Sequence, residues 1–390
     1  DIRGPLFVEA MKRQKQGIDV LKLNTGNPAT FGFGLPDSIK NALMEHIQDG
    51  VGYCDFKGMP QARQAICDYE TSKGIKGITP DDVFIGNGVS EVVSFALTPL
   101  LNDGDEVLVP SPSYSLWGNS VYLEDGKPVF YTCDEKANWY PDIQDIRSKI
   151  TDKTKAIVII NPNNPTGVLY PKEILLEIIQ VAREFGLLIF ADEIYDRLVM
   201  DGKQHISLAS LTEDVPVITL NGLSKSHCRC GYRSGWMVIS GPRELTEDYR
   251  QGIIQLTSLR LCANTMAQIV IPAALDDMET PASMVRPGGR IYEQREATVR
   301  ELEKIDGLSF VKNDAAFYVF PKLDVKKFNI TNDKQFAHDL LDATNILLVP
   351  GSGFDWKDPD HFRIVMLPQA DVLSDAIRRM GTFLDGYKQK

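Results

Sequence analysis

The middle of the chain alternates short, almost wholly apolar runs with longer runs in which apolar residues recur every three or four positions. Five runs rich in β-branched residues predict strands at residues 83–85, 106–109, 156–160, 187–191 and 217–220. Such continuous hydrophobicity is typical of strands buried on both faces of a sheet. The segment KEILLEIIQVAREFG (residues 172–186) has helical spacing and ends at a glycine, as helices often do. The alternation predicts an α/β fold whose mostly parallel sheet is covered by helices.

The C-terminal part of the chain follows a different pattern. A long helical run, IYEQREATVRELEKI, follows RPGGR at residues 286–290, and shorter strand-like runs appear near residues 315–320, 346–349 and 362–365. This predicts a second, smaller α+β domain, and the leading arm of the chain is expected to pack on it. The expected segments are 1–48 (arm and part of the small domain), 49–286 (large domain) and 287–390 (small C-terminal domain).

Length and charge narrow the classes of function. A chain of 390 residues is long enough for two domains. Its net charge of −11 argues against nucleic acid or an anionic membrane as a partner. No apolar run approaches the ~20 residues that span a bilayer, and the first residues are mixed and polar rather than a secretory signal. We therefore expect a cytoplasmic protein that acts on small molecules.

Cysteine and histidine usage gives no sign of a metal site. The six cysteines and five histidines are scattered, without a CxxC pair or a cluster at metal-ligand spacing. In a chain of this length the sequence favours reduced thiols over a disulfide framework.

Unusual residues follow four of the predicted strands. These are GNGVSE at residues 86–91, NPNNPTG at 161–167, DEIY at 192–195 and NGLSK at 221–225. Ligands of such sheets bind beyond the carboxyl ends of the strands. One crevice is therefore expected to collect a glycine-rich turn, an amide, a carboxylate, a phenol and a lysine.

Each of these pieces also has an ordinary structural interpretation. The GNGVSE turn can bind an anion at a helix N-terminus or simply connect a strand to a helix, and it matches neither GxGxxG nor a Walker motif. The NPNNPTG turn is either a rigid positioning loop or a plain one. Asp192, directly after a buried strand, needs a partner, which is either a cationic ligand nitrogen or the cap of the following segment.

Lys225 decides between these interpretations. A lysine desolvated at a strand end can form a Schiff base, although most lysines only extend their ammonium group to the surface. Arg233, eight residues later, is able to bind a phosphate bidentately. A phosphate site, a carboxylate for a ring nitrogen, donors for a phenolate and an imine lysine together describe pyridoxal 5′-phosphate.

Motifs along the whole chain carry a family resemblance. They include LKLNTGNPATFGF, GYCDFKG, IGNGVSE, VPSPSYSLW, INPNNPTG, FADEIYD, NGLSK, PGGRIYEQR and PDHFRIVMLP. The chain resembles the class I aminotransferases of fold type I, and most of all those that use alanine and glutamate. This resemblance implies a pyridoxal-phosphate enzyme that works as a homodimer with shared active sites.

The resemblance also implies roles for particular residues around the cofactor ring. Lys225 is similar to the lysine that forms the Schiff base and then moves the proton at the substrate Cα. Asp192 matches the carboxylate that pairs with the pyridinium nitrogen, and Tyr195 and Asn164 match the groups that hydrogen-bond the phenolic oxygen. Tyr114 resembles the aromatic side chain that stacks on the ring.

Further roles concern the phosphate and the substrate. The resemblance assigns the phosphate to Gly88, Val89, Ser90, Ser224 and Arg233, with Tyr53 contributed by the partner subunit. It assigns the substrate carboxylate to Arg363, with contacts from Gly26 and Asn164. The chain departs from the family where the usual arginine, three residues after the lysine, is replaced by Cys228; an arginine follows one position later, at Arg229.

The function implied is a ping-pong transfer of an amino group between alanine or glutamate and pyruvate or 2-oxoglutarate. Two alternatives stay open from the sequence. The first is another reaction on the same cofactor, by an aromatic or broad-range aminotransferase or a carbon–sulfur lyase. The second is a non-enzymatic ligand-sensing domain of a transcription regulator, which would require an additional DNA-binding segment.

Overall fold

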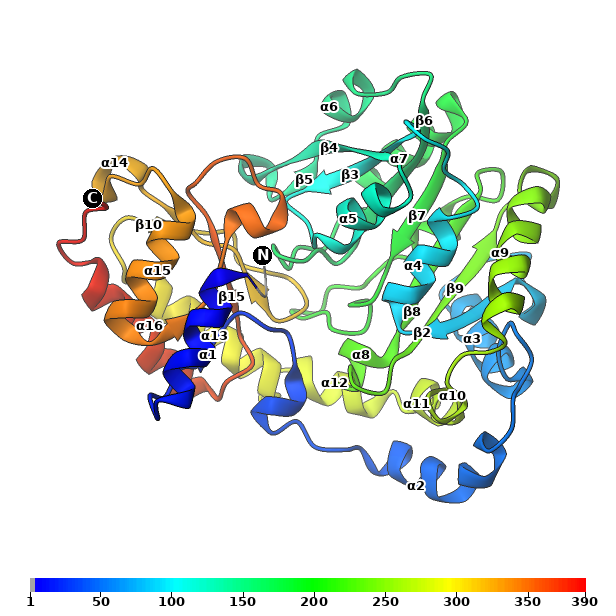
Figure 1. The fold of residues 1–390 in the computed structure, drawn as a ribbon, viewed down its shortest axis with the longest axis horizontal. Coiled ribbons are helices and arrows are strands. Elements are labelled where there is room, and N and C mark those ends of the chain that lie inside the picture. The colour runs from blue at the N-terminus through cyan, green and yellow to red at the C-terminus, as the bar shows by residue number, and fades with distance from the viewer. Residues whose placement is uncertain (1–3) are drawn as a thin grey trace.

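The computed structural model describes residues 4–390, and its largest element is an eight-stranded sheet (Figure 1). The strands are ordered β2–β9–β8–β7–β6–β3–β4–β5. Their bounds are β2 (Val83–Asn87), β3 (Glu106–Ser111), β4 (Lys127–Asp134), β5 (Tyr140–Pro141), β6 (Thr154–Ile160), β7 (Leu188–Asp192), β8 (Val217–Gly222) and β9 (Ser234–Ser240).

The sheet is mixed but mostly parallel, as the pattern of apolar runs predicts. Strands β8, β7, β6, β3 and β4 pair in parallel in that order. Strand β9 is antiparallel to both of its neighbours, so β2 points the same way as β8. All five predicted runs form strands of this sheet, and β4, β5 and β9 were not predicted. The carboxyl ends of β2, β6, β7 and β8 therefore meet at one edge.

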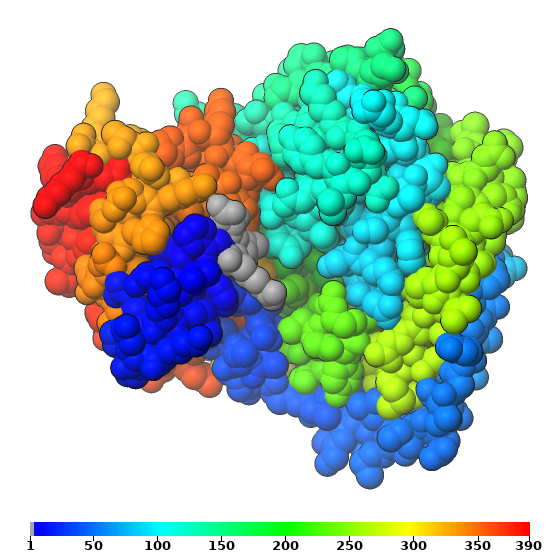
Figure 2. Space-filling view, viewed as in Figure 1, coloured from blue at the N-terminus to red at the C-terminus, as the bar shows by residue number. Residues whose placement is uncertain are grey.

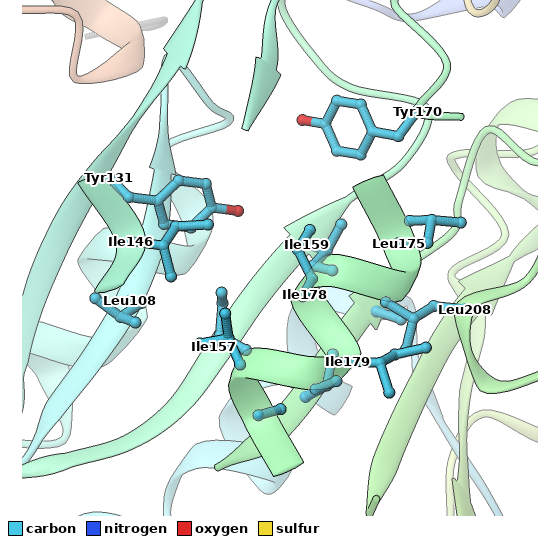
Figure 3. Close-up of a cluster of buried hydrophobic side chains, with 14 of the residues drawn as sticks. Leu108, Tyr131, Ile146, Ile157, Ile159, Tyr170, Leu175, Ile178, Ile179 and Leu208 are labelled. Atoms are coloured by element: carbon cyan, nitrogen blue, oxygen red, sulfur yellow. The ribbon is translucent and has the colours of Figure 1, made fainter. Parts of the chain in front are cut away.

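Two apolar clusters cover the two faces of the sheet. Because strand side chains alternate between faces, Val107 and Val109 join one cluster and Leu108 joins the other. Helices α4 (Val89–Leu97), α5 (Leu116–Leu123) and α9 (Glu247–Arg260) contribute to the first cluster. Helices α6 (Ile143–Ser148) and α7 (Lys172–Phe185) contribute to the second. Figure 3 shows the second cluster, in which Leu175, Ile178 and Ile179 of α7 lie against Ile157 and Ile159 of the sheet.

Helix α7 (Lys172–Phe185) shows why the sequence forms these layers. Its buried residues Leu175, Ile178, Ile179 and Ala182 recur at helical spacing and form one face. The helix ends at Gly186, whose φ of 65° is left-handed, a conformation that glycine adopts at helix C-termini without a steric penalty. The predicted helix is confirmed almost to the residue.

The C-terminal part carries three short sheets and its own apolar cluster. The sheets pair β1 (Leu21–Lys22) with β13 (Ile346–Leu347), β10 (Leu308–Ser309) with β12 (Lys322–Leu323), and β11 (Tyr318–Val319) and β14 (Val349–Pro350) with β15 (Phe362–Val365). The strands predicted at 315–320 and 346–349 are shorter than expected, because a turn at residues 316–317 interrupts the first run and the strand pairing is broken at Leu348 in the second. The expected α+β character is present.

The N-terminal arm lies against this C-terminal part (Figure 2). Strand β1 pairs in parallel with β13, and Leu23 belongs to the C-terminal apolar cluster. Arg13 of α1 bonds to Asp342 and Asn345 at the end of α15. These contacts agree with the expected packing of the arm, while the exact domain boundaries stay a prediction.

The helices are α1 (Pro5–Lys15), α2 (Asp37–His46), α3 (Pro60–Ser72), α4 (Val89–Leu97), α5 (Leu116–Leu123), α6 (Ile143–Ser148), α7, α8 (Leu223–Ser226), α9 (Glu247–Arg260), α10 (Thr265–Ile269), α11 (Ile271–Asp276), α12 (Glu279–Val285), α13 (Arg290–Leu302), α14 (Val325–Phe328), α15 (Asp333–Thr344) and α16 (Ala370–Leu384). Within residues 4–390, none of them combines the length and the hydrophobicity that crossing a membrane requires.

Candidate active site

The sheet edge at the carboxyl ends of β2, β7 and β8 gathers several of the predicted site residues. Asp192 is the last residue of β7, and Gly88 follows β2 directly. Lys225 lies on the short helix α8, which begins directly after β8. This edge is the place where ligands of open α/β sheets bind.

Asp192 is a buried carboxylate that is only partly neutralised by its neighbours. It accepts hydrogen bonds from Trp117 Nε1 at 3.1 Å and from the Ile194 backbone N–H at 3.3 Å. Burial raises the pKa of Asp192 to about 6, although the bond from Trp117 and the charge of Lys225 act in the opposite direction. A cationic nitrogen placed beside this carboxylate would stabilise its charged form.

Lys225 has no carboxylate within salt-bridge distance in the part of the chain that the structure describes. Its Nζ donates to the carbonyl oxygen of Gly26 at 2.9 Å and lies 6.0 Å from the centre of the Phe317 ring. The amine is thus held by a carbonyl group and an aromatic face. Such a lysine is available for covalent chemistry with a carbonyl compound.

The turn between β2 and α4 forms a cradle that only glycine permits. Gly88 has a φ of 79°, and a Cβ atom there would lie 2.2 Å from Nη2 of Arg233. A Cβ atom on Gly235 would lie 2.5 Å from the backbone N of Val89. The Arg233 guanidinium and the first N–H groups of α4 are therefore close together, and both stabilise an anion. Ser90 lies in the first turn of α4, and Ser224 is buried directly before Lys225.

Arg363 of β15 is a buried guanidinium without a counter-charge among the described residues. It is 2 % exposed and donates from Nη1 to Asn164 Oδ1 at 2.9 Å and from Nη2 to the Asn24 carbonyl. Its Nε is buried without a hydrogen-bond partner, and burial lowers the pKa of the guanidinium from its usual value. Because a buried charge is costly unless it is paired, this geometry favours a carboxylate ligand.

Two tyrosines connect this arginine to the sheet edge. The hydroxyl groups of Tyr195 and Tyr318 lie 2.8 Å apart, and the Arg363 guanidinium stacks on the Tyr318 ring at 4.6 Å. A Cβ atom on Gly26 would lie 2.3 Å from the Tyr318 hydroxyl. Gly26 is therefore enclosed between Lys225 and Tyr318, and no larger residue fits there.

Two predicted residues are less enclosed. Tyr114 is partly exposed and lies near enough to Arg363 to influence the pKa of that group. Tyr53 is 85 % exposed, so the single chain does not bring its side chain into the crevice. Its predicted role in a partner subunit stays a prediction. Within residues 4–390, no group of three or more metal-ligating side chains lies together.

Several residues that shape the site were not predicted from the sequence. Trp117 holds Asp192, Tyr318 holds both Tyr195 and Arg363, and Asn24 accepts from Arg363. Trp117 lies within the quoted segment VPSPSYSLW and Tyr318 within a predicted strand. Both residues therefore lie in segments that the sequence singles out. Their contacts with Asp192 and Tyr195, each more than seventy residues away in the chain, could not be predicted from the sequence.

Comparison with known proteins gives a consistent result over the whole chain. A family model described as aminotransferase class I and II matches residues 18–379. The glutamate-pyruvate aminotransferase AlaA of Haemophilus influenzae is 50 % identical over 389 residues, which cover 100 % of this chain and 96 % of that protein.

Solved structures agree. The crystal structure of an aminotransferase from Escherichia coli superposes with a TM-score of 0.98 at 48 % identity, covering 100 % of this chain and 96 % of that one. The alanine aminotransferase of Pyrococcus furiosus gives a TM-score of 0.94 at 41 % identity, covering 99 % and 97 %.

Proposed function

The chain belongs to the class I and II aminotransferases, and we propose that it moves amino groups between alanine or glutamate and pyruvate or 2-oxoglutarate, using pyridoxal 5′-phosphate. The observation that carries this proposal is the Lys225 amine, which has no carboxylate within salt-bridge distance among residues 4–390 and lies at the exit of β8, beside the exit of β7 that bears Asp192. The relatives named above as glutamate-pyruvate and alanine aminotransferases support the choice of substrates.

The residues of the crevice fit this cofactor. Because Gly88 has no side chain, the Arg233 guanidinium can lie against the turn that begins α4, and this guanidinium and the first N–H groups of α4 would together bind a phosphate group. Asp192 offers a carboxylate to a ring nitrogen, and Tyr195 offers a hydroxyl group to the phenolic oxygen. When bound, pyridoxal phosphate supplies an electron sink for the bonding electrons of the substrate Cα.

The proton transfer and the stabilisation of the ring charge are carried out by side chains of the protein. Lys225 Nζ removes the proton from the substrate Cα and returns one later, as a general base and then a general acid. Asp192 would pair its negative charge with the ring nitrogen and so favour the protonated, cationic form of the ring. In the ping-pong order, the first 2-oxo acid leaves before the second one binds.

Arg363 binds the α-carboxylate of each substrate in turn. Its planar fork makes two parallel hydrogen bonds to a carboxylate, and its present bonds to Asn164 and Asn24 hold the guanidinium in place. Because Arg363 lies on β15 of the C-terminal part and Lys225 lies on the large sheet, one substrate molecule bridges the two.

The working unit that we propose is a homodimer in which Tyr53 of each subunit reaches the phosphate of the other. Tyr53 is exposed in the single chain, and it is close in sequence to other exposed apolar residues, Met44, Ile47 and Val51. Burying these side chains against a second copy would remove apolar surface from water, which supports association.

A half-reaction screen tests the proposed function. The holoenzyme is mixed with each amino acid in turn, without any 2-oxo acid, and the cofactor absorbance is followed. Alanine and glutamate are expected to convert the cofactor fastest. Release of ammonia and pyruvate from cystine, with no response to alanine or glutamate, would instead identify a carbon–sulfur lyase.

A further inference from the structure

Among residues 4–390, arginines without an acidic partner are a minority, in a chain whose net charge is −11. Most described arginines have a carboxylate oxygen within 4.0 Å. The exceptions among residues 4–390 are Arg197, Arg229, Arg233, Arg290 and Arg363. Arg233 and Arg363 are the two arginines that the proposed function assigns to anions. An arginine without a carboxylate partner is therefore a candidate for binding an anion.

Arg197 does not fit this pattern, because the protein occupies its guanidinium. It donates to the Tyr69 hydroxyl and to the carbonyl groups of Ala274 and Leu275, and it stacks on the Tyr69 ring at 4.4 Å. Arg229 and Arg290 remain, and they are the two arginines that line one cavity of about 420 Å³. This cavity lies between residues 32–36, the segment after Lys225, and helices α12 and α13.

The two guanidinium groups are positioned by the same backbone segment. Arg229 donates from Nη2 to the Phe33 and Gly34 carbonyls and from Nε to the His227 carbonyl. Arg290 donates from Nη2 to the Phe31 and Leu367 carbonyls, and its guanidinium lies 3.9 Å from the centre of the Phe33 ring. Arg290 Nε also donates to Gln294 Oε1 at 2.8 Å. The Nε and Nη2 atoms of both arginines are therefore occupied, and the orientation of each guanidinium is fixed.

The remaining nitrogen of each group is free to bind a ligand. Nη1 of Arg229 and Nη1 of Arg290 have no hydrogen-bond partner among the described residues, and neither is among the buried unpaired atoms, so both reach open space. Arg229 is only 8 % exposed, which makes its unpaired charge costly. None of the described residues that line the cavity is acidic.

We propose that this cavity is a second anion site, separate from the crevice at the sheet edge, that binds a small oxyanion through the Nη1 atoms of Arg229 and Arg290. The ligand is a carboxylate or phosphoryl group, because these groups match the donor geometry of guanidinium. A bound anion would tie residues 31–34 more firmly to α13 and to the segment after Lys225. Gly26, whose carbonyl oxygen accepts a hydrogen bond from Lys225, lies a few residues before this segment in the chain.

Isothermal titration of the holoenzyme with inorganic phosphate, and separately with acetate, tests this site. Every sample carries Arg363→Gln, so that the proposed substrate arginine cannot bind the probe. We expect saturable binding, and the tighter probe identifies the site as one for phosphoryl or for carboxylate groups. Arg229→Gln and Arg290→Gln should each weaken it by roughly tenfold or more, since each removes a charge-assisted hydrogen bond.

Arg286→Gln is the matched control. Arg286 directly follows α12, whose residues Thr280, Ser283 and Met284 line the cavity, but Arg286 does not line it and is exposed and paired with Glu279 at 2.6 Å. Its loss should leave the affinity unchanged. Arg229 also donates hydrogen bonds to backbone carbonyl groups, so Arg229→Gln could fail to fold. In that case Arg290→Gln, at a half-buried arginine, is the variant that tests the site. The proposal is overturned if neither probe binds saturably, if binding survives Arg290→Gln, or if Arg286→Gln weakens binding equally.

Discussion

At the scale of single residues, Lys225 and Lys73 differ in what surrounds their ammonium groups. Lys73 contacts Glu70, Glu193 and Asp196 at 2.7 to 3.1 Å, whereas Lys225 donates to one carbonyl oxygen. Carboxylates hold a lysine in its charged form, and only the neutral amine attacks a carbonyl. We expect borohydride reduction of the holoenzyme and peptide mapping to place the pyridoxyl group on Lys225 and none on Lys73. A label on any other lysine contradicts the proposed site.

Asp192 should make the stability of the cofactor-free protein depend on pH. Its carboxyl has a pKa raised by burial from 3.8 to about 6, so the folded protein binds its proton more tightly than the unfolded chain does. Stability is therefore lost as the pH rises through this window, by about 3 kcal/mol for this group. Asparagine at this position cannot ionise but can still accept the Trp117 bond.

The measurement is urea unfolding of the cofactor-free wild type and Asp192→Asn at about pH 4 and about pH 7. Relative to wild type, the variant should gain about 2 kcal/mol between the two pH values, because part of the effect is already present at pH 4. A difference between the proteins that does not change with pH would refute the argument. In the holoenzyme the same substitution should slow amino transfer far more than Tyr195→Phe, because only Asp192 offers a charge to the ring nitrogen.

Arg363→Lys tests the proposed substrate contact. Lysine keeps the positive charge but loses the planar fork, so KM for the amino acid and the 2-oxo acid should rise about tenfold or more. The absorbance of the bound cofactor should stay unchanged. Arg378→Lys, at an exposed arginine paired with Glu301, is the control and should leave both KM values unaltered. Unchanged half-reaction kinetics in Arg363→Lys would exclude the assignment.

At the scale of elements, the turn between β2 and α4 can be tested with two glycines. Gly88 and Gly104 both have a φ of 79°, but a Cβ atom collides with Arg233 only at Gly88 and meets nothing within 4 Å at Gly104. Alanine at either position adds backbone strain of about 1 to 3 kcal/mol. Only Gly88→Ala should weaken cofactor binding, by about tenfold or more, in a fluorescence titration of the cofactor-free protein. Equal losses in both variants would show that strain alone is responsible.

Much of this element layout could be predicted from the sequence, since the apolar runs of β2, β3, β6, β7 and β8 and the helical spacing of α7 are local patterns. Strand β4 was missed because its residues are only partly buried and alternate irregularly. Strand β9 was not predicted although residues 236–239 form a buried apolar run; what the sequence does not show is its antiparallel pairing with β2, far away in the chain. Long-range pairing is a property of the assembled sheet and leaves no periodic signal in a single strand.

The candidate site likewise contains residues that local patterns predict and contacts that only tertiary packing creates. Asp192 and Lys225 could be predicted because each follows an apolar strand, and such positions converge in every open α/β sheet. The contacts of Trp117 with Asp192 and of Tyr318 with Tyr195 could not, since each joins residues whose distance is decided by tertiary packing. The cavity at Arg229 and Arg290 belongs to this second class.

At the scale of the whole molecule, one chain supplies all but one of the proposed cofactor contacts. The exception is Tyr53, which is exposed beside a group of apolar residues. A second copy that covers this surface would complete the site, so the dimer and the active site are expected to form together. Tyr53→Phe should therefore loosen the cofactor by about tenfold, through the loss of a hydrogen bond to a charged group. Tyr122→Phe, at another exposed tyrosine, should not.

Mixing subunits decides whether Tyr53 crosses to the partner. In a dimer of Tyr53→Phe with the inactive Lys225→Ala, crossing places both defects in one site and leaves the other site intact. If Tyr53 served its own subunit, each site would carry one defect. We therefore expect the mixture to recover active sites with full cofactor affinity, measured as activity at limiting cofactor. If every active site in the mixture binds the cofactor weakly, or if light scattering finds a monomer, Tyr53 does not complete a partner's site.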